Sequence, residues 1–75
     1  MVGDVAAVEA MGSRGLVAVM VDKGGLGELA LVDGVTGELV YSVETPAVAH
    51  ELTASPDGST LAVQLQGEVH FFDVR

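Results

Sequence analysis

Short apolar runs, each ended by Gly, Pro, Asp or Ser, divide the chain into seven segments. The runs are rich in Val, and no period of 3.6 residues continues for about 11 residues or more, so the pattern predicts strands and no helices. Short connections between such runs join antiparallel neighbours. We therefore expect an all-β chain, with antiparallel strands at 5–11, 16–22, 28–33, 38–44, 48–54, 60–66 and 68–74.

Two of these segments differ in the faces that they are expected to bury. Residues 16–21 are apolar at every position, which is typical of a strand covered on both faces. Residues 39–44 alternate instead, with Ser42 and Glu44 on one face and apolar side chains on the other. We expect the alternating segment to be an exposed outer strand.

The same pattern occurs twice along the chain. Residues 8–10 (VEA) are repeated 44 positions later by LTA, and residues 17–19 (VAV) are repeated at the same distance by LAV. Residues 27–33 (GELALVD) are repeated 40 positions later by GEVHFFD, so the first copy is four residues longer, which the stretch 23–26 (KGGL) accounts for. A repeat of this length, built from short strands, predicts units that cannot bury both of their faces alone.

The repeat predicts one small domain over residues 1–75 that contains two units. The first unit covers about 5–44, and the second is partial, covers about 48–75 and lacks its outermost strand. Either other chains supply that strand and the cover for the outward faces, or the chain is a piece of a larger propeller.

Two turn sequences have a specific backbone chemistry. In the turn Ser55, Pro56, Asp57, Gly58, the proline presets φ near −65°, the aspartate bonds back to the backbone and the glycine adopts a positive φ. The stretch Asp33, Gly34, Val35, Thr36, Gly37 offers the same chemistry between the third and fourth strands. We expect both to be tight structural turns.

These turns and their flanking strands resemble WD-repeat and YVTN-type β-propellers. Residues 49–63 (AHELTASPDGSTLAV) are similar to the first half of a blade, and residues 31–38 (LVDGVTGE) to the connection before the outermost strand. His50 favours the YVTN-like variety, while Phe72-Asp73 stands in place of the Trp-Asp pair of the WD family. The resemblance implies antiparallel propeller blades completed by oligomerisation, and it implies no particular activity, because propellers host scaffolds and enzymes alike.

Charge and composition narrow the classes of partner. Eleven acidic residues against three basic ones give a net charge of −8, which argues against nucleic acid and against anionic membranes. The chain has no cysteine, and its longest apolar run is far shorter than a membrane helix of about 20 residues. Asp4 stands where a secretory signal has positive charge, so we expect a soluble, cytoplasmic chain.

The two histidines are the candidate metal ligands. His50 precedes an inner strand, where copies of it in a ring could converge on a metal or an anion; we interpret it in preference as a polar rim residue. His70 shares a strand face with Glu68, and no second ligand follows it at metal-site spacing. We therefore expect no metal, no cofactor and no catalytic residues.

The inserted loop is the candidate recognition element. Lys23, Gly24 and Gly25 could be compared with a phosphate-binding loop, but a strand and not a helix follows them, so we interpret them as a hairpin insertion that could contact a ligand. The acidic residues at 22, 28, 33 and 38 are candidates for an acidic rim, and we interpret them in preference as a solvated edge.

The end of the second unit is the expected assembly edge. Val69, Phe71, Phe72 and Val74 lie on a third strand that has no fourth strand beside it. We expect a homo-oligomer of three or four chains that acts as a non-catalytic binding scaffold for a protein or a small molecule. The alternatives are a lactonase-like or quinoprotein-like enzyme with its site at the channel of the ring, and a fragment that completes a larger partner's propeller.

Overall fold

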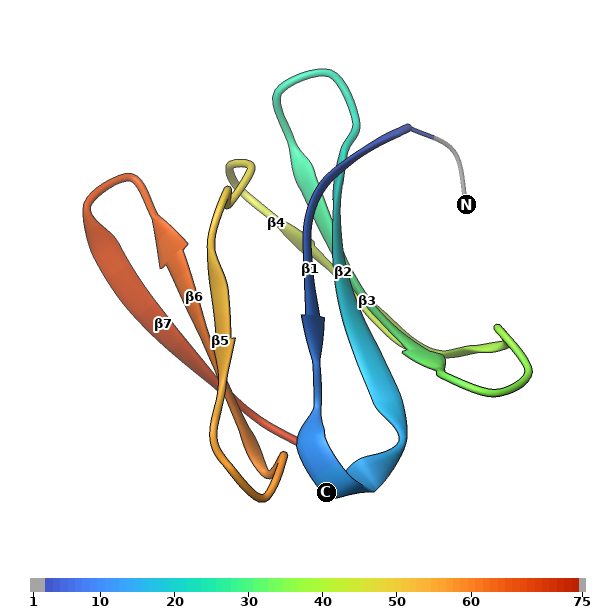
Figure 1. Ribbon diagram of the computed structural model, residues 1–75. Helices are drawn as coiled ribbons and strands as arrows, with labels where there is room; N and C mark the ends of the chain where they lie inside the picture. Colours follow the sequence, from blue (N-terminus) through green and yellow to red (C-terminus); the bar gives the residue numbers. More distant parts are fainter. Residues whose placement is uncertain (1–2, 75) are drawn as a thin grey trace.

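The computed structural model describes residues 3–74, and within them the chain is all-β, as predicted (Figure 1). The strands are β1 (Asp4–Ala10), β2 (Leu16–Asp22), β3 (Gly27–Asp33), β4 (Leu39–Thr45), β5 (Leu52–Ala54), β6 (Thr60–Leu65) and β7 (Glu68–Asp73). A short 3-10 turn, η1 (Gly12–Arg14), which the pattern did not predict, connects β1 to β2.

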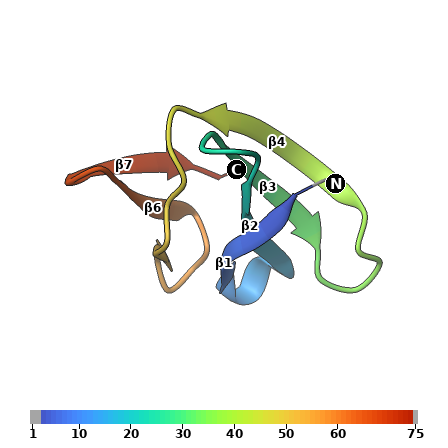
Figure 2. The same ribbon diagram turned by 90° about the horizontal axis from the view of Figure 1, so that it is seen from above.

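The strands form two antiparallel sheets, each in chain order. The first sheet is β1-β2-β3-β4 and the second is β5-β6-β7. The two copies of the sequence repeat therefore form one sheet each. Figure 2 shows the sheets from above, with β3 and β4 at the far end of the first sheet from β1, and β7 at the far end of the second.

The fifth strand is shorter than the predicted 48–54, because only Leu52–Ala54 pairs with β6. The preceding residues cross from β4 to the second sheet. Ala47 and Ala49 are buried in the core, and the buried Thr45 hydroxyl donates a 2.7 Å hydrogen bond to the Ala47 carbonyl. The prediction of strand over 48–51 was wrong, because this stretch crosses between the sheets, where Ala49 is buried in the core, and it does not pair with β6.

The core lies between the two sheets. Side chains on alternate positions of β2 and β3 meet those of β5 and β6, and Met11 joins them from the loop after β1. The buried cluster contains Met11, Ala18, Met20, Leu29, Leu31, Ala47, Ala49, Leu52, Leu61, Val63, Leu65 and Val74. The buried run at 18–21 confirms the expectation of a covered strand, and the exposure of most of β4 confirms that it is the outer strand.

The inner strands of the two sheets, β1 and β5, lie side by side in the middle of the molecule (Figure 1). One carboxylate oxygen of Glu9 on β1 accepts a 2.9 Å hydrogen bond from the backbone N–H of Ala54 on β5. This bond satisfies a donor at the free edge of β5 and fixes the two sheets relative to each other.

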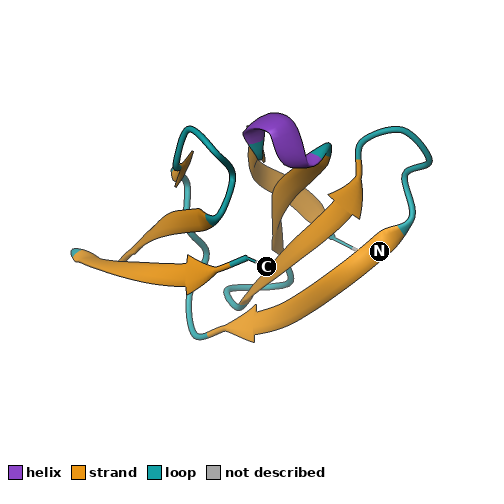
Figure 3. Cartoon of the chain, turned by 90° about the horizontal axis from the view of Figure 1, so that it is seen from below, coloured by secondary structure: helices purple, strands orange, loops and turns teal. Residues whose placement is uncertain are grey.

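A close contact between two turns joins the sheets at one end, where η1 lies beside the β5–β6 turn (Figure 3). Gly58 has φ +74°, as the turn sequence predicts, and a Cβ there would overlap the carbonyl oxygen of Met11. Gly12 has φ +60°, and a Cβ there would lie 2.7 Å from the carbonyl oxygen of Pro56. Both positions require glycine for conformation and for space.

Candidate functional site

The outward face of the second sheet presents two large apolar side chains. Val69 is 55% exposed and Phe71 is 73% exposed. Phe71 pairs with Ala62 and Val69 with Gln64, which places all four on the face of the sheet that lies away from the core. An exposed aromatic and an exposed valine side by side are candidates for a protein contact.

The expected assembly edge is divided between the two faces of β7. Phe72 pairs with Leu61 and packs, half-buried, against the core. Val74 is buried, and its backbone N–H donates a 2.7 Å hydrogen bond to the Ser59 carbonyl. Val74 therefore lies just beyond the end of β7 at Asp73, with its side chain turned into the core.

A second apolar face lies on the opposite side of the molecule. Val5 and Val8 on β1 are 60% and 58% exposed. Val8 pairs with Val19 and Val5 with Val21, so the four valines share one face of the first sheet. Val19 and Val21 are buried on this face, and Val5 and Val8 are its exposed members. β1 was not among the predicted contact surfaces, although Val8 aligns in the repeat with the buried Leu52.

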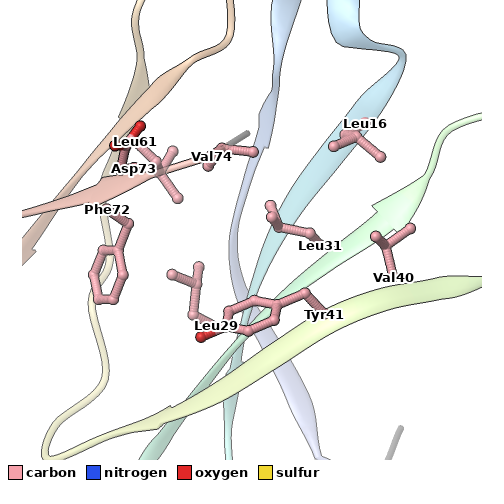
Figure 4. A pocket seen from close by; sticks show the side chains of 9 residues that line it. All are labelled: Leu16, Leu29, Leu31, Val40, Tyr41, Leu61, Phe72, Asp73 and Val74. Carbon is pink, nitrogen blue, oxygen red and sulfur yellow. The ribbon is translucent and has the colours of Figure 1, made fainter.

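Between the outer parts of the two sheets lies a cleft of about 530 Å³, which we call the outer cleft (Figure 4). Its first-sheet wall comes from β2, β3 and β4, and its second-sheet wall from β6, β7 and the residue after β7. The side chains that define it are Leu29, Leu31, Tyr41, Leu61, Phe72 and Val74. The polar atoms at its border include the Tyr41 hydroxyl and the Asp73 carboxylate.

Asp57 organises the turn between β5 and β6. Its Oδ1 accepts hydrogen bonds from the backbone N–H of Ser59 at 3.0 Å, the Ser59 hydroxyl at 2.8 Å and the Ser55 hydroxyl at 2.9 Å. These bonds, the backbone N–H of Ser59 first, lower the pKa of Asp57 to about 2. The carboxylate is therefore a structural acceptor and is ionised at neutral pH.

Asp33 has the matching role between β3 and β4. Its Oδ1 accepts bonds from the N–H groups of Thr36 at 3.0 Å and Val35 at 2.8 Å, and these bonds lower the pKa of Asp33. The N–H of Gly37 donates to the Asp33 carbonyl at 2.8 Å, and the N–H of Gly34 donates to the Gly15 carbonyl at 2.8 Å. The chemistry expected of this turn is present.

The inserted loop at 23–26 is an exposed hairpin turn. The side chain of Asp22 accepts 3.1 Å hydrogen bonds from the N–H groups of Gly24 and Gly25, so these donors are engaged within the loop. Lys23 Nζ lies 3.3 Å from a carboxylate oxygen of Glu28. The register places Asp22 and Glu28 at one end of the β2–β3 hairpin and Asp33 at the other, so the suggested acidic rim is not formed as one cluster.

The two histidines are both exposed; His50 lies in the connection before β5, and His70 lies on β7. His50 precedes β5 and borders a shallow depression with Glu51 and Gln64. His70 Nε2 lies 3.3 Å from Glu68 Oε1, which is the carboxylate that shares its face. Within residues 3–74, no group of three or more His, Cys, Asp and Glu side chains is arranged to hold a metal ion.

Comparison with protein families, with curated proteins and with solved structures gives no match for this chain. Over the described part of the chain, no helix has the length and apolar character needed to cross a bilayer. The features of the molecule that bear on its function are the two outward faces, the outer cleft and the internal repeat.

Proposed function

We propose that the chain is a non-catalytic β-propeller module that assembles head to tail with copies of itself and serves as a binding scaffold. One observation carries the proposal. Val69 and Phe71 occupy the repeat positions of Leu29 and Leu31, 40 residues earlier. Leu29 and Leu31 are only 3% and 7% exposed, because the second sheet covers them.

The surface that covers Leu29 and Leu31 also has a counterpart. Leu61 and Val63 lie in the core opposite β3, and their repeat equivalents, 44 positions earlier, are Val17 and Val19. Val19 lies on the outward face of the first sheet, where it pairs with Val8. The two outward faces of each chain are therefore the repeat equivalents of the two surfaces that pack against each other between its own sheets.

In the proposed assembly, the outward face of one second sheet packs on the outward face of another chain's first sheet. Burial of a Val or Phe side chain contributes about 1.5–3 kcal/mol, which opposes the cost of association. The two faces are different, so the contact is head-to-tail and must close into a ring to avoid a fibre. Three or four chains would give roughly six or eight sheets, the upper part of the usual propeller range of about four to eight.

Two regions at the ends of the sheets are our candidates for ligand contact in such a scaffold. The first is the loop with Lys23, Gly24 and Gly25, which is exposed and is the place where the two repeats differ in length. The second is the surface around His50. The aspartates of the turns are engaged with backbone donors, which supports a structural role for them.

Native mass spectrometry at micromolar concentration tests the assembly. We expect a trimer or tetramer for the unmodified chain and a monomer for Phe71→Ser. The matched control is Val35→Ser, because Val35 is 92% exposed but lies in the β3–β4 turn and not on a docking face. A folded monomer for the unmodified chain, or equal loss of assembly in both variants, would refute the proposal.

A further inference from the structure

The outer cleft lies beside the C-terminal end of β7, where Phe72 and Asp73 line it, and one edge of β7 has no neighbouring strand among the described residues. In the second sheet β7 is hydrogen-bonded to β6 on one side, whereas its equivalent in the first sheet, β3, is hydrogen-bonded to both β2 and β4. An edge strand beside an apolar cleft is the arrangement that accepts an added strand, with backbone bonds at the edge and alternate side chains in the cleft.

The first sheet shows how such a strand would sit. On β3, the ladder to β4 pairs Glu28 with Glu44, Ala30 with Ser42 and Val32 with Leu39. β7 follows β3 by 40 positions in the repeat. The same register would therefore place the residues of an added strand opposite Glu68, His70 and Phe72. These three share the face of β7 that is turned toward the first sheet, since their pairing partners on β6 lie in the core. A residue opposite Phe72 would therefore enter the outer cleft.

The charges around Glu68 indicate which kind of strand would pair with β7. In the first sheet Glu28 and Glu44 stand directly opposite each other, and Lys23 lies 3.3 Å from Glu28. The second copy of the repeat lacks the four residues that include Lys23, and the partner of Glu68 is His70. A strand with a basic residue opposite Glu68 would supply the missing positive charge, while an acidic one would place like charges together.

We propose that the outer cleft and the edge of β7 bind an extended segment of a partner protein, which adds to the second sheet as its fourth strand. The segment carries an apolar side chain opposite Phe72 and a Lys or Arg opposite Glu68. A second copy of this chain fits less well as the donor, because its own outer strand would bring Glu44 to Glu68. The cleft, at about 530 Å³, is within the range of about 300–1,000 Å³ that is typical of ligand sites.

The probe is a peptide that copies residues 37–46 of this chain (GELVYSVETP), made in two versions: with Glu44 as it stands, and with Glu44→Lys. Calorimetry and backbone amide NMR on the intact chain measure the binding. We expect the Lys peptide to bind, to shift the amides of residues 68–73 and to bind about tenfold more tightly than the Glu peptide.

Two variants separate this site from self-assembly. Tyr41→Ser alters the wall of the outer cleft. We expect it to lower the affinity for the Lys peptide about tenfold and to leave the native mass of the assembly unchanged. Phe71→Ser alters the other face of β7, and we expect it to change the native mass and to leave peptide affinity unchanged.

Four results would overturn the inference while leaving the proposed assembly intact. They are no binding of the Lys peptide at about millimolar concentration, equal affinity for both peptides, unchanged affinity in a Tyr41→Ser chain that melts like the unmodified one, and amide shifts confined to β1 or β5.

Discussion

The third strands of the two sheets, β3 and β7, carry equivalent side chains in different surroundings. β3 lies between β2 and β4, and its Leu29 and Leu31 are covered by the second sheet. β7 pairs with β6, and its Val69 and Phe71 point away from the core. The alternation along a strand therefore determines which side chains share a face, and a neighbouring sheet determines whether this face is buried.

The largest expected effect comes from shortening the equivalent side chains of the two strands. Leu31→Ala should lower the free energy of unfolding by about 2–5 kcal/mol, because it opens a cavity between the sheets. Val69→Ala should lower it by less than about 0.5 kcal/mol in a dilute, unassembled chain, because that side chain is already in water. Urea denaturation followed by circular dichroism measures both, and similar losses would contradict the difference between the strands.

The turns of the two sheets give a matched pair of glycines. Gly37 and Gly58 have φ of +76° and +74°, so alanine at either one carries a similar conformational cost of about 1 kcal/mol. Open space surrounds Gly37, whereas the Met11 carbonyl oxygen occupies the place of a Cβ at Gly58. We expect Gly58→Ala to destabilise the chain by about 1–3 kcal/mol more than Gly37→Ala. Equal melting temperatures for the two variants would argue against the close contact between η1 and the β5–β6 turn.

The smallest expected effect is a pH dependence of the second-sheet turn. The pKa of Asp57 in the folded chain is about 2, below its usual 3.8. Because the pKa is lowered in the folded state, the ionised carboxylate stabilises the folded chain at pH values above the usual pKa. This contribution is lost as the pH falls from roughly 4 to roughly 2. Asp57→Asn should therefore flatten the fall of the melting temperature in that window.

Asp33→Asn is the matched change in the first sheet. Asp33 accepts two backbone bonds at Oδ1, whereas Asp57 accepts one backbone bond and two hydroxyl bonds, so we expect the flattening to be smaller for Asp33→Asn. A melting curve for Asp57→Asn that runs parallel to that of the unmodified chain between pH 4 and pH 2 would contradict the assignment.

Much of the fold could be predicted because its determinants are local. The apolar runs and the turn residues predicted all seven strands, and six of them agree with the structure to within a residue or so at most ends. The positive φ of Gly58 followed from the chemistry of the turn after Pro56. The fifth strand was predicted too long. The apolar residues before Leu52 belong to the connection between the two sheets and do not pair with β6.

The candidate site depends on relations that a single strand does not show. The outer cleft exists because two sheets meet along β1 and β5 and leave space between β4 and β7, and no local pattern encodes that geometry. The placement of Phe72 and Val74 toward the core depends in the same way on the second sheet facing the first. The internal repeat links distant positions, because it aligns the exposed Val8, Val69 and Phe71 with residues that are buried in the other copy.

Native mass spectrometry of two complementary variants tests the head-to-tail contact most directly. Phe71→Lys disables the outward face of the second sheet, and Val8→Lys disables that of the first. Each variant alone should be monomeric, and an equimolar mixture should form a one-to-one heterodimer, because one intact face remains on each. A dimer of Val8→Lys alone, or a mixture that stays monomeric, would contradict the contact.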